Sequence, residues 1–280
     1  MNSDKEILFP PELEGAGIRW FDTHAHYWDE KFRDPDSLLD RLCGCGLEYV
    51  VNVGTTADTS ALCLSMAARF PRMYVAAGIH PEDCHALQGT VDEEVDRIWN
   101  LIRSNRNRVV AIGEIGLDYY WPTNYGKPLD KPLEKAYFDA QLSLAEELGL
   151  PVVIHDRDAH GDCVDLLMAH PRVTGVLHSY SGSAETAREL IKRGYYISFS
   201  GVISFKNATR IADVVRSVPD EAILSETDCP YLAPVPYRGE INHSGMMIHT
   251  LSAMARIRGS TLEKTAELTL ENGRRLFGLN

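Results

Sequence analysis

Side chains that can bind metal ions recur in this sequence directly after apolar runs of residues. The runs are IRWFDTHAH, VVAIGEIGLD, PVVIHDRD, TGVLHSY and AILSETDCP. The side chains that they present are His24, His26, Glu114, His155, His178 and Asp228. Imidazole nitrogens and carboxylate oxygens are common ligands of divalent cations. If the apolar runs are parallel β-strands, their carboxyl ends meet at one rim, and all of these side chains converge there.

The first two histidines form an H-x-H pair. His24 and His26 are two residues apart, so on a strand their side chains project from the same face and can bind one cation. The alternative is a pair of structural histidines in a barrel core. Glu114 lies between Gly113 and Gly116, whose small size leaves room for a ligand. A buried carboxylate needs a positive partner, which a metal ion or an ion-paired core residue would supply.

The remaining ligand candidates come from the second half of the chain. His155 and His178 each end an apolar run, and each alone is also compatible with a hydrogen-bonded structural histidine. Asp228 can bind metal and can serve as a general base. Its alternative role is a helix or turn cap, because Pro230 follows closely. Glu226, two residues before Asp228 on the same face, is a competing candidate for the base.

This ligand set is larger than one tetrahedral ion needs. It suits a two-metal site bridged by a carboxylate, for which Glu114 is the candidate. Imidazole-rich ligation favours zinc or manganese over magnesium without excluding magnesium. We therefore expect two divalent metal ions as cofactors, with Mg, Zn and Mn all open.

Three further residues are candidates for binding substrate at the same rim. His80 follows the third apolar strand in GIHPED, although Pro81 also suits it to a turn. Arg157 and Lys206 can bind phosphate oxygens, and their alternative role is that of ordinary surface charges. The other histidines lie in expected loops or helices, where we interpret them as solvated: His85, His160, His170, His243 and His249.

Strand-like and helix-like segments alternate along the chain. Strands are predicted over residues 18–24, 48–54, 73–79, 109–114, 151–155, 174–178, 195–200 and 222–227. Helices are predicted over residues 36–45, 57–70, 91–104, 133–148, 162–169, 184–193, 211–217, 246–257 and 262–270. Alternating apolar strands and helices indicate a parallel sheet covered by helices. Eight such units favour a (β/α)8 TIM barrel over an open sheet. Residues 230–245 are expected to form a loop over the rim.

Length and composition agree with one α/β domain. The chain has 280 residues, 44% hydrophobic and 24% charged, which is typical of a globular protein. We expect an N-terminal extension over residues 1–17 and a single barrel domain over residues 18–280. No apolar run approaches the ~18 residues of a membrane span, the N-terminus does not resemble a secretory signal, and the scattered cysteines indicate reduced thiols. These features predict a cytoplasmic protein with no membrane partner.

The net charge bears on the kind of substrate. A formal charge of -12 disfavours tight binding of duplex nucleic acid, since non-specific affinity comes mostly from lysine and arginine. Bound divalent cations would add local positive charge that the whole-chain value does not report. Phosphate chemistry at the rim therefore remains compatible with this charge.

Several blocks of the sequence resemble the TatD-family metal-dependent deoxyribonucleases. They are FDTHAH, GIHP, AIGEIGLDYY, FDAQLSLAEELGLPVVIHDRDA, GVLHSYSGS, YYISFSGVISFKNA, ETDCPYLAP and AELTLENGRRLF, in order from Trp20 to Phe277. The resemblance implies a (β/α)8 metallohydrolase of the amidohydrolase type, often a 3′ to 5′ exonuclease on single-stranded DNA.

The resemblance also assigns roles within the predicted site. It implies that His24, His26 and Asp228 bind one metal and that Glu114 bridges to a second metal. The second metal would be bound by the histidines at positions 155 and 178. The chain departs from the family pattern at Ser179, where the family often has cysteine, and in EINHSGMM, where an R-N-E-P-like stretch is common.

We therefore predict a divalent-metal-dependent phosphodiester hydrolase with Asp228 and Glu114 as catalytic residues and single-stranded DNA as substrate. One alternative is a cyclic amidase, deacylase or lactonase that uses the same centre on a carbonyl group. Arg157 and Lys206 favour the phosphodiester, because an amide requires no such cations. Another alternative is a metal-binding protein whose catalysis has lapsed, which the large ligand set disfavours. The sequence leaves the oligomeric state open, a monomer included.

Overall fold

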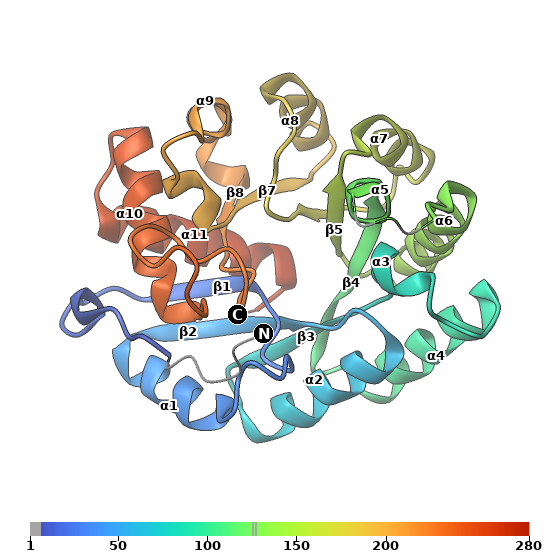
Figure 1. Cartoon of the computed structure of the whole chain (residues 1–280), viewed down its shortest axis with the longest axis horizontal. Coiled ribbons are helices and arrows are strands. Elements are labelled where there is room, and N and C mark those ends of the chain that lie inside the picture. Colours follow the sequence, from blue (N-terminus) through green and yellow to red (C-terminus); the bar gives the residue numbers. More distant parts are fainter. Residues whose placement is uncertain (1–6, 125, 127, 280) are drawn as a thin grey trace.

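Eight parallel strands form the centre of the molecule, in the order β1 to β8. The computed structural model describes residues 7–124, 126 and 128–279. The strands are β1 (Trp20–Ala25), β2 (Leu47–Val53), β3 (Met73–Ala77), β4 (Val109–Asp118), β5 (Val152–Arg157), β6 (Gly175–Leu177), β7 (Tyr196–Phe199) and β8 (Ile223–Ser225). Each pairs in parallel with the next. The predicted (β/α)8 barrel is confirmed (Figure 1).

Most of the helices surround these strands as an outer ring. The helices are α1 (Pro35–Cys45), α2 (Ala57–Arg69), α3 (Pro81–Cys84), α4 (Val91–Ser104), α5 (Tyr120–Asn124), α6 (Lys131–Leu148), α7 (His160–Ala169), α8 (Ala184–Ile191), α9 (Thr209–Ser217), α10 (Met247–Arg258) and α11 (Leu262–Phe277). Local sequence sets their ends: α6 begins after Asp130, whose side chain accepts from Leu133 N, and stops at Gly149 in the left-handed conformation. The short helices α3 and α5 were not predicted.

The segment after β8 closes the barrel against β1. Ala25 and Cys229 form an isolated parallel bridge. Asp228 N donates to His24 O at 2.9 Å, and His26 N donates to Cys229 O at 2.7 Å. This pairing holds the segment that carries Asp228 beside the H-x-H pair.

A buried aspartate reinforces the closure. Both carboxylate oxygens of Asp22 accept hydrogen bonds from Thr227, and Oδ2 also accepts from Ser244 Oγ at 2.7 Å. Burial raises the pKa of Asp22 to about 6, although these hydrogen bonds oppose the shift. One side chain thus ties β1 to the loop that follows β8.

Strands β4 and β5 are longer than predicted. Their pairing continues from Ile115 opposite Ile154 to Asp118 opposite Arg157, after a register shift. The sequence predicted that Glu114 ends this strand, but in the structure Glu114 lies inside β4. The backbone of residue 78 lies close to β4 just before Glu114. Only glycine fits there, because a Cβ at Gly78 would lie 2.8 Å from the carbonyl carbon of Gly113.

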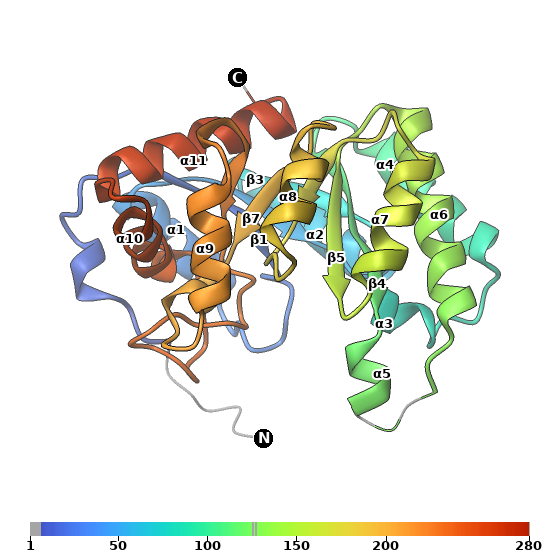
Figure 2. The ribbon, with the colours of Figure 1, turned by 90° about the horizontal axis from the view of Figure 1, so that it is seen from above.

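The barrel has one packed end and one open end. Apolar side chains that include Phe21, Val51, Leu224 and Phe277 form a compact cluster, and Figure 2 shows α11 across the end opposite to the tip of β5. The site therefore lies at the carboxyl rim of the strands. None of the helices in the described part of the chain is both long and apolar enough to cross a bilayer.

The described part of the predicted extension, residues 7–17, packs against the barrel. Leu13 is buried in the main core. The Phe9 ring stacks on the His243 ring with centroids 5.6 Å apart, and the Arg41 guanidinium lies 3.6 Å from the Phe9 ring centroid. The domain boundary at residue 18 stays a prediction.

Candidate metal centre and active site

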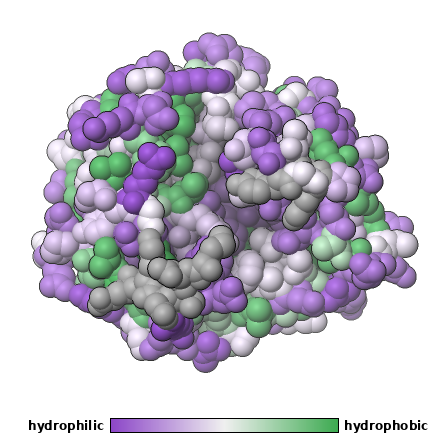
Figure 3. Space-filling view, viewed as in Figure 1, coloured by the Kyte–Doolittle hydropathy of each residue, from purple (hydrophilic) through white to green (hydrophobic). Residues whose placement is uncertain are grey.

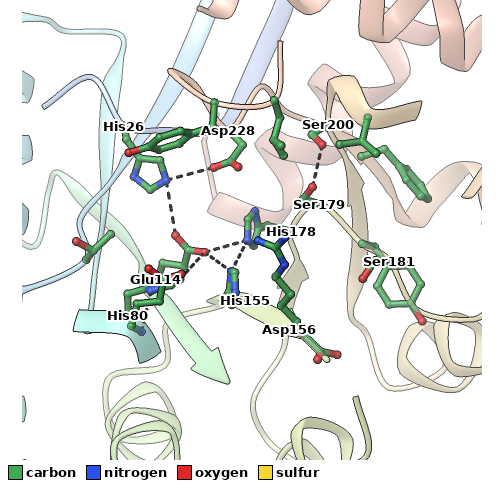
Figure 4. Close-up of a pocket in the computed structure, with 18 of the residues that line it drawn as sticks. His26, His80, Glu114, His155, Asp156, His178, Ser179, Ser181, Ser200 and Asp228 are labelled. Carbon is green, nitrogen blue, oxygen red and sulfur yellow. Dashed lines mark hydrogen bonds and ion pairs between the residues drawn. The ribbon is translucent and has the colours of Figure 1, made fainter. Parts of the chain in front are cut away.

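A cavity of about 770 Å³ opens at the carboxyl rim of the barrel. Figure 3 shows this face, where hydrophilic and hydrophobic residues both border the recessed centre. Its lining includes residues that the sequence singled out: His26, His80, Glu114, His155, Arg157, His178 and Asp228. His24 lies beneath them and is fully buried. Figure 4 shows His26, His155 and His178 around Glu114, whereas Ser179, Ser181 and Ser200 lie to one side.

The first cluster of donor atoms comes from β1 and the segment after β8; it consists of His24, His26 and Asp228. The two Nε2 atoms are 3.1 Å apart. Asp228 Oδ1 lies 3.3 Å from His26 Nε2 and 3.6 Å from His24 Nε2. Asp228 has φ 57°, a left-handed conformation that is costly for a residue other than glycine. The bonds of its neighbours to β1 hold the carboxylate in this orientation.

The second cluster consists of His155 on β5 and His178, which follows β6. His155 Nδ1 and His178 Nε2 are 3.1 Å apart. Glu114 lies between the two clusters. Its Oε1 is 3.0 Å from His155 Nδ1 and 2.9 Å from His178 Nε2, whereas its Oε2 is 3.3 Å from His24 Nε2. Each carboxylate oxygen thus faces one cluster, which is the arrangement required of a bridging ligand.

The outer nitrogens of three histidines meet acceptors that determine which nitrogen carries the proton. His26 Nδ1 is 2.9 Å from Val53 O, His155 Nε2 is 2.8 Å from Asp118 Oδ2, and His178 Nδ1 is 3.2 Å from Glu226 Oε1. Only an N–H can donate to these oxygens. In each neutral ring the other nitrogen therefore turns its lone pair toward the clusters.

This donor set fits divalent cations. Facing lone pairs at 3.1 Å repel unless a proton or a cation lies between them. Imidazole and carboxylate donors gathered in this way suit zinc, manganese or magnesium. The residues that would hold the ions are therefore the two clusters together with Glu114.

The charges of the metal-free site follow from this crowding. Burial opposes ionisation of Glu114, but His178, His80 and His24 outweigh it and hold its pKa well below the usual range. Burial also opposes protonation of His155, yet Asp118 and Glu114 raise its pKa to about 9. In the absence of a cation, protons occupy part of the second cluster.

His80 has a different role from the ligands. It caps α3, because its Nδ1 accepts a hydrogen bond from Glu82 N at 3.1 Å. The proton of the neutral ring is therefore on Nε2, which lies 3.5 Å from Glu114 Oε1 at the cavity wall. The turn role and the cavity role expected from the sequence thus coexist in one residue. His80 offers a hydrogen-bond donor rather than a lone pair.

The structure separates the two predicted phosphate-binding cations. Arg157 lines the cavity, with its guanidinium 4.0 Å from the Tyr120 ring centroid and 5.4 Å from the Trp121 ring centroid. Lys206 is exposed in the turn after Gly201–Ser204. It is not among the described residues that line the cavity. Only Arg157 is brought to the centre.

The competing base Glu226 lies behind the ligands. Its Oε1 accepts from Ser179 N at 2.7 Å and faces His178 Nδ1. Sequence reasoning missed Asp118 altogether, although it ends β4 in GLDYY, just as the ligands follow apolar runs. The signal was therefore present, but Asp118 lies behind His155, 2.8 Å from its Nε2, and is not among the described residues that line the cavity.

The prediction that the other histidines are solvated is wrong for His243. This ring is fully buried, and its Nε2 is 2.9 Å from Leu8 O. Burial lowers its pKa to about 4. The residue His85 is exposed, although its Nε2 lies 2.9 Å from Glu134 Oε1. These contacts involve residues far away in the sequence, which local patterns do not reveal.

The barrel and its paired donor clusters define a metal-dependent hydrolase. The family model described as "TatD related DNase" matches residues 21–278. The chain therefore belongs to the TatD-related DNase family.

Relatives cover nearly the whole chain. An uncharacterized metal-dependent hydrolase of Bacillus subtilis, YabD, is 38% identical over 263 residues, covering 93% of this chain and 99% of the relative. An uncharacterized metal-dependent hydrolase of Escherichia coli K12, YcfH, is 33% identical to this chain over 266 residues, covering 92% of this chain and 96% of the relative. The crystal structure of YJJV, a TatD homolog from Escherichia coli K12, has a TM-score of 0.84 and 28% identity, covering 94% and 99%.

Proposed function

We propose that this protein is a deoxyribonuclease that hydrolyses phosphodiester bonds of single-stranded DNA from the 3′ end. The observation that carries the proposal is the division of Glu114 between two donor clusters, 2.9 Å from His178 Nε2 and 3.3 Å from His24 Nε2. Such paired sites suit in-line displacement at phosphorus. The family description, TatD related DNase, supports the same reaction.

Bound divalent cations would neutralise the phosphate and acidify the attacking water. The chain's own residues do the rest. Burial opposes ionisation of Asp228, but His26, His178 and His24 keep its pKa below the usual range. Asp228 is therefore ionised at neutral pH and can accept the proton of the attacking water. Its Oδ1 faces His26 Nε2 and His24 Nε2, which would hold the cation that activates this water.

Two donors at the wall are suited to the phosphate. His80 Nε2–H points to the cavity beside Glu114. Arg157, whose guanidinium lies over Tyr120, supplies a fixed positive charge. Together they can bind the oxygens that accumulate charge during displacement.

The charge of the cavity favours a short stretch of nucleic acid. Its lining includes the carboxylates of Glu82, Asp83 and Asp156 as well as those of the ligands, with Arg157 as the arginine. A duplex gains its affinity from many cation–phosphate contacts, which this lining does not offer. A single strand entering by one end requires only the contacts beside the metal centre.

The test is turnover of defined substrates by protein of known metal content. We expect 3′-labelled single-stranded DNA to be shortened stepwise, with slower reaction of duplex DNA and RNA. A dihydroorotate-like amide serves as the control for the amidase, deacylase or lactonase alternative. Hydrolysis of the amide without any phosphodiester cleavage would contradict the proposal. Loss of all turnover in protein with both ions bound would favour the alternative of lapsed catalysis.

A further inference from the structure

Aromatic side chains flank the metal centre on two opposite sides of the barrel. Trp28, which follows β1, and Tyr231, which follows β8, form what we term the first wall. Trp121, which follows β4, and Arg157 at the end of β5 form the second wall. All four line the cavity. In a barrel with strand order β1 to β8, the β8/β1 side lies opposite the β4/β5 side.

The first wall shares its anchor with the first metal-binding cluster. Val53 O lies 2.9 Å from His26 Nδ1 and also accepts from Trp28 Nε1 at 2.7 Å. One carbonyl therefore orients both a ligand and an indole. Tyr231 donates from its hydroxyl to Asp29 at 2.8 Å and remains 45% exposed. Its ring is held in place, with the Lys31 ammonium 4.1 Å from its centroid.

The second wall shares its anchor with the second cluster. Asp118 Oδ2 lies 2.8 Å from His155 Nε2, while Oδ1 accepts from Tyr120 N and Trp121 N at 2.8 Å each. One carboxylate therefore orients a ligand and begins the helix α5 that carries the indole. Arg157 completes the wall by lying over Tyr120.

We propose that the two walls bind the nucleobases on either side of the scissile phosphate, so that the smallest efficient substrate is a dinucleotide. This inference rests on the proposed function. A phosphate held beside Glu114 by bound cations would lie between the clusters, and its two nucleosides would extend toward opposite sides of the barrel. Every nucleobase has a π-face that can stack on an aromatic ring or a guanidinium plane, so little sequence preference is expected.

The experiment compares three phosphodiesters: d(TpT), with two bases; thymidine 5′-(p-nitrophenyl phosphate), with one; and methyl p-nitrophenyl phosphate, with none. For each substrate the variant-to-wild-type ratio of kcat/KM is measured, which cancels differences between leaving groups. Trp28→Leu and Trp121→Leu should each lower kcat/KM for d(TpT) by about 10-fold or more, the scale of one stacked base. The loss on the base-free diester should be clearly smaller.

A matched control and a binding measurement complete the test. Trp99 lies on α4, where its Nε1 donates to Glu147. Trp99→Leu should leave all three ratios near one. In Asp228→Asn protein, d(TpT) should quench tryptophan fluorescence, with weaker quenching and a raised Kd in the Trp121→Leu background.

Two outcomes separate the claims. Equal losses on all three substrates in the wall variants would mean that the tryptophans only support the metal centre, and would overturn the inference while leaving the nuclease intact. If wild-type protein cleaves no phosphodiester at all, the proposed function fails. In that case the fluorescence measurement still tests whether the two walls bind nucleobases. Absence of quenching by d(TpT) would contradict this binding as well.

Discussion

The two donor clusters differ in what lies behind their histidines. In the second cluster both imidazoles are backed by carboxylates, Asp118 behind His155 and Glu226 behind His178. In the first cluster His26 is backed only by a backbone carbonyl. The Nδ1 atom of His24 is buried without a hydrogen-bond partner among the described residues.

Because of this difference, we expect the two clusters to have different roles. A carboxylate behind an imidazole fixes its orientation and raises its basicity as a ligand. The second cluster should therefore bind its cation more tightly, while a cation held by the first cluster, which includes Asp228, would be more electron-poor. The pKa values follow this division only in part: burial and His178 lower that of His24, but Asp228 and Glu114 raise that of His26 against the effect of burial, and that of His155 rises to about 9. We expect the first cluster to activate water and the second to anchor the phosphate.

The largest effect is expected where the two clusters meet. Glu114→Ala removes one oxygen from each cluster and should lower turnover by about 10³-fold, the upper range for loss of one electrostatic stabiliser. Metal content should fall in both clusters, as measured by elemental analysis after dialysis. His24→Ala and His178→Ala provide the comparison, since each should deplete mainly one ion. Two full equivalents of metal in Glu114→Ala would contradict the bridging role.

The next effect belongs to the first cluster alone. Asp228→Asn keeps the size and one oxygen of the side chain but removes the base. We expect kcat to fall by about 10²-fold or more, the usual scale for general base catalysis, while d(TpT) still binds. Glu226→Gln is the matched variant, because Glu226 faces His178 Nδ1 rather than the attacking water. A larger loss of kcat in Glu226→Gln than in Asp228→Asn would exchange their roles.

The anchoring carboxylates of the second cluster should affect affinity for metal more than chemistry. Asp118→Asn preserves an oxygen for the N–H groups of Tyr120 and Trp121 but weakens the bond to His155 Nε2. We expect the affinity of one cation to fall by about 10- to 100-fold and the other to stay unchanged, as measured by competition with a chelator. Equal weakening of both cations would show that the clusters act as one cooperative unit.

Much of this site was accessible from the sequence, because parallel strands bring their carboxyl ends to one rim. The ligand candidates from His24 to Asp228 all meet there. The roles of the partners behind them were not recognised: Glu226 was expected only as a competing base, and Asp118 was missed. Asp118 reaches His155 only because β4 and β5 remain paired beyond Glu114, and strand length is poorly marked in uniformly apolar runs. The exposed position of Lys206 depends on the turn after β7, which no periodic pattern specifies.

Binding of a cation to the second cluster should release a proton from His155. The pKa of His155 is about 9 in the metal-free protein, above its ordinary value of 6.5. Between these values the folded, metal-free ring is protonated and a cation must displace the proton. The affinity for metal should therefore rise with pH through this window, with release of about one proton per bound ion. Proton uptake or release can be followed in weakly buffered solution.

The same shift predicts the stability of the metal-free protein. A raised histidine pKa stabilises the folded state fully below 6.5, and this contribution disappears as pH rises through about 9. The free energy of unfolding in denaturant should fall across that window. His155→Gln, which has no such proton, is the control and should show a flatter profile. An identical decline in both proteins would assign the titration to another group.

The smallest effect concerns the charge beside the second cluster. Arg157 lines the cavity and Lys206 does not, so the two cations should no longer behave alike when removed. Arg157→Ala should raise KM for single-stranded DNA several-fold and reduce the salt slope by about 0.7, the contribution of one phosphate contact. Metal content should stay unchanged, because Arg157 is not one of the proposed ligands. Lys206→Ala should leave KM and the salt slope at the wild-type values.

If both variants keep wild-type kinetics, phosphate recognition at this wall is contradicted, and a carbonyl substrate becomes the better explanation of the centre. If Lys206→Ala has the larger effect, DNA reaches the metals across β7 rather than β5, and the anchoring role assigned to the second cluster must move with it.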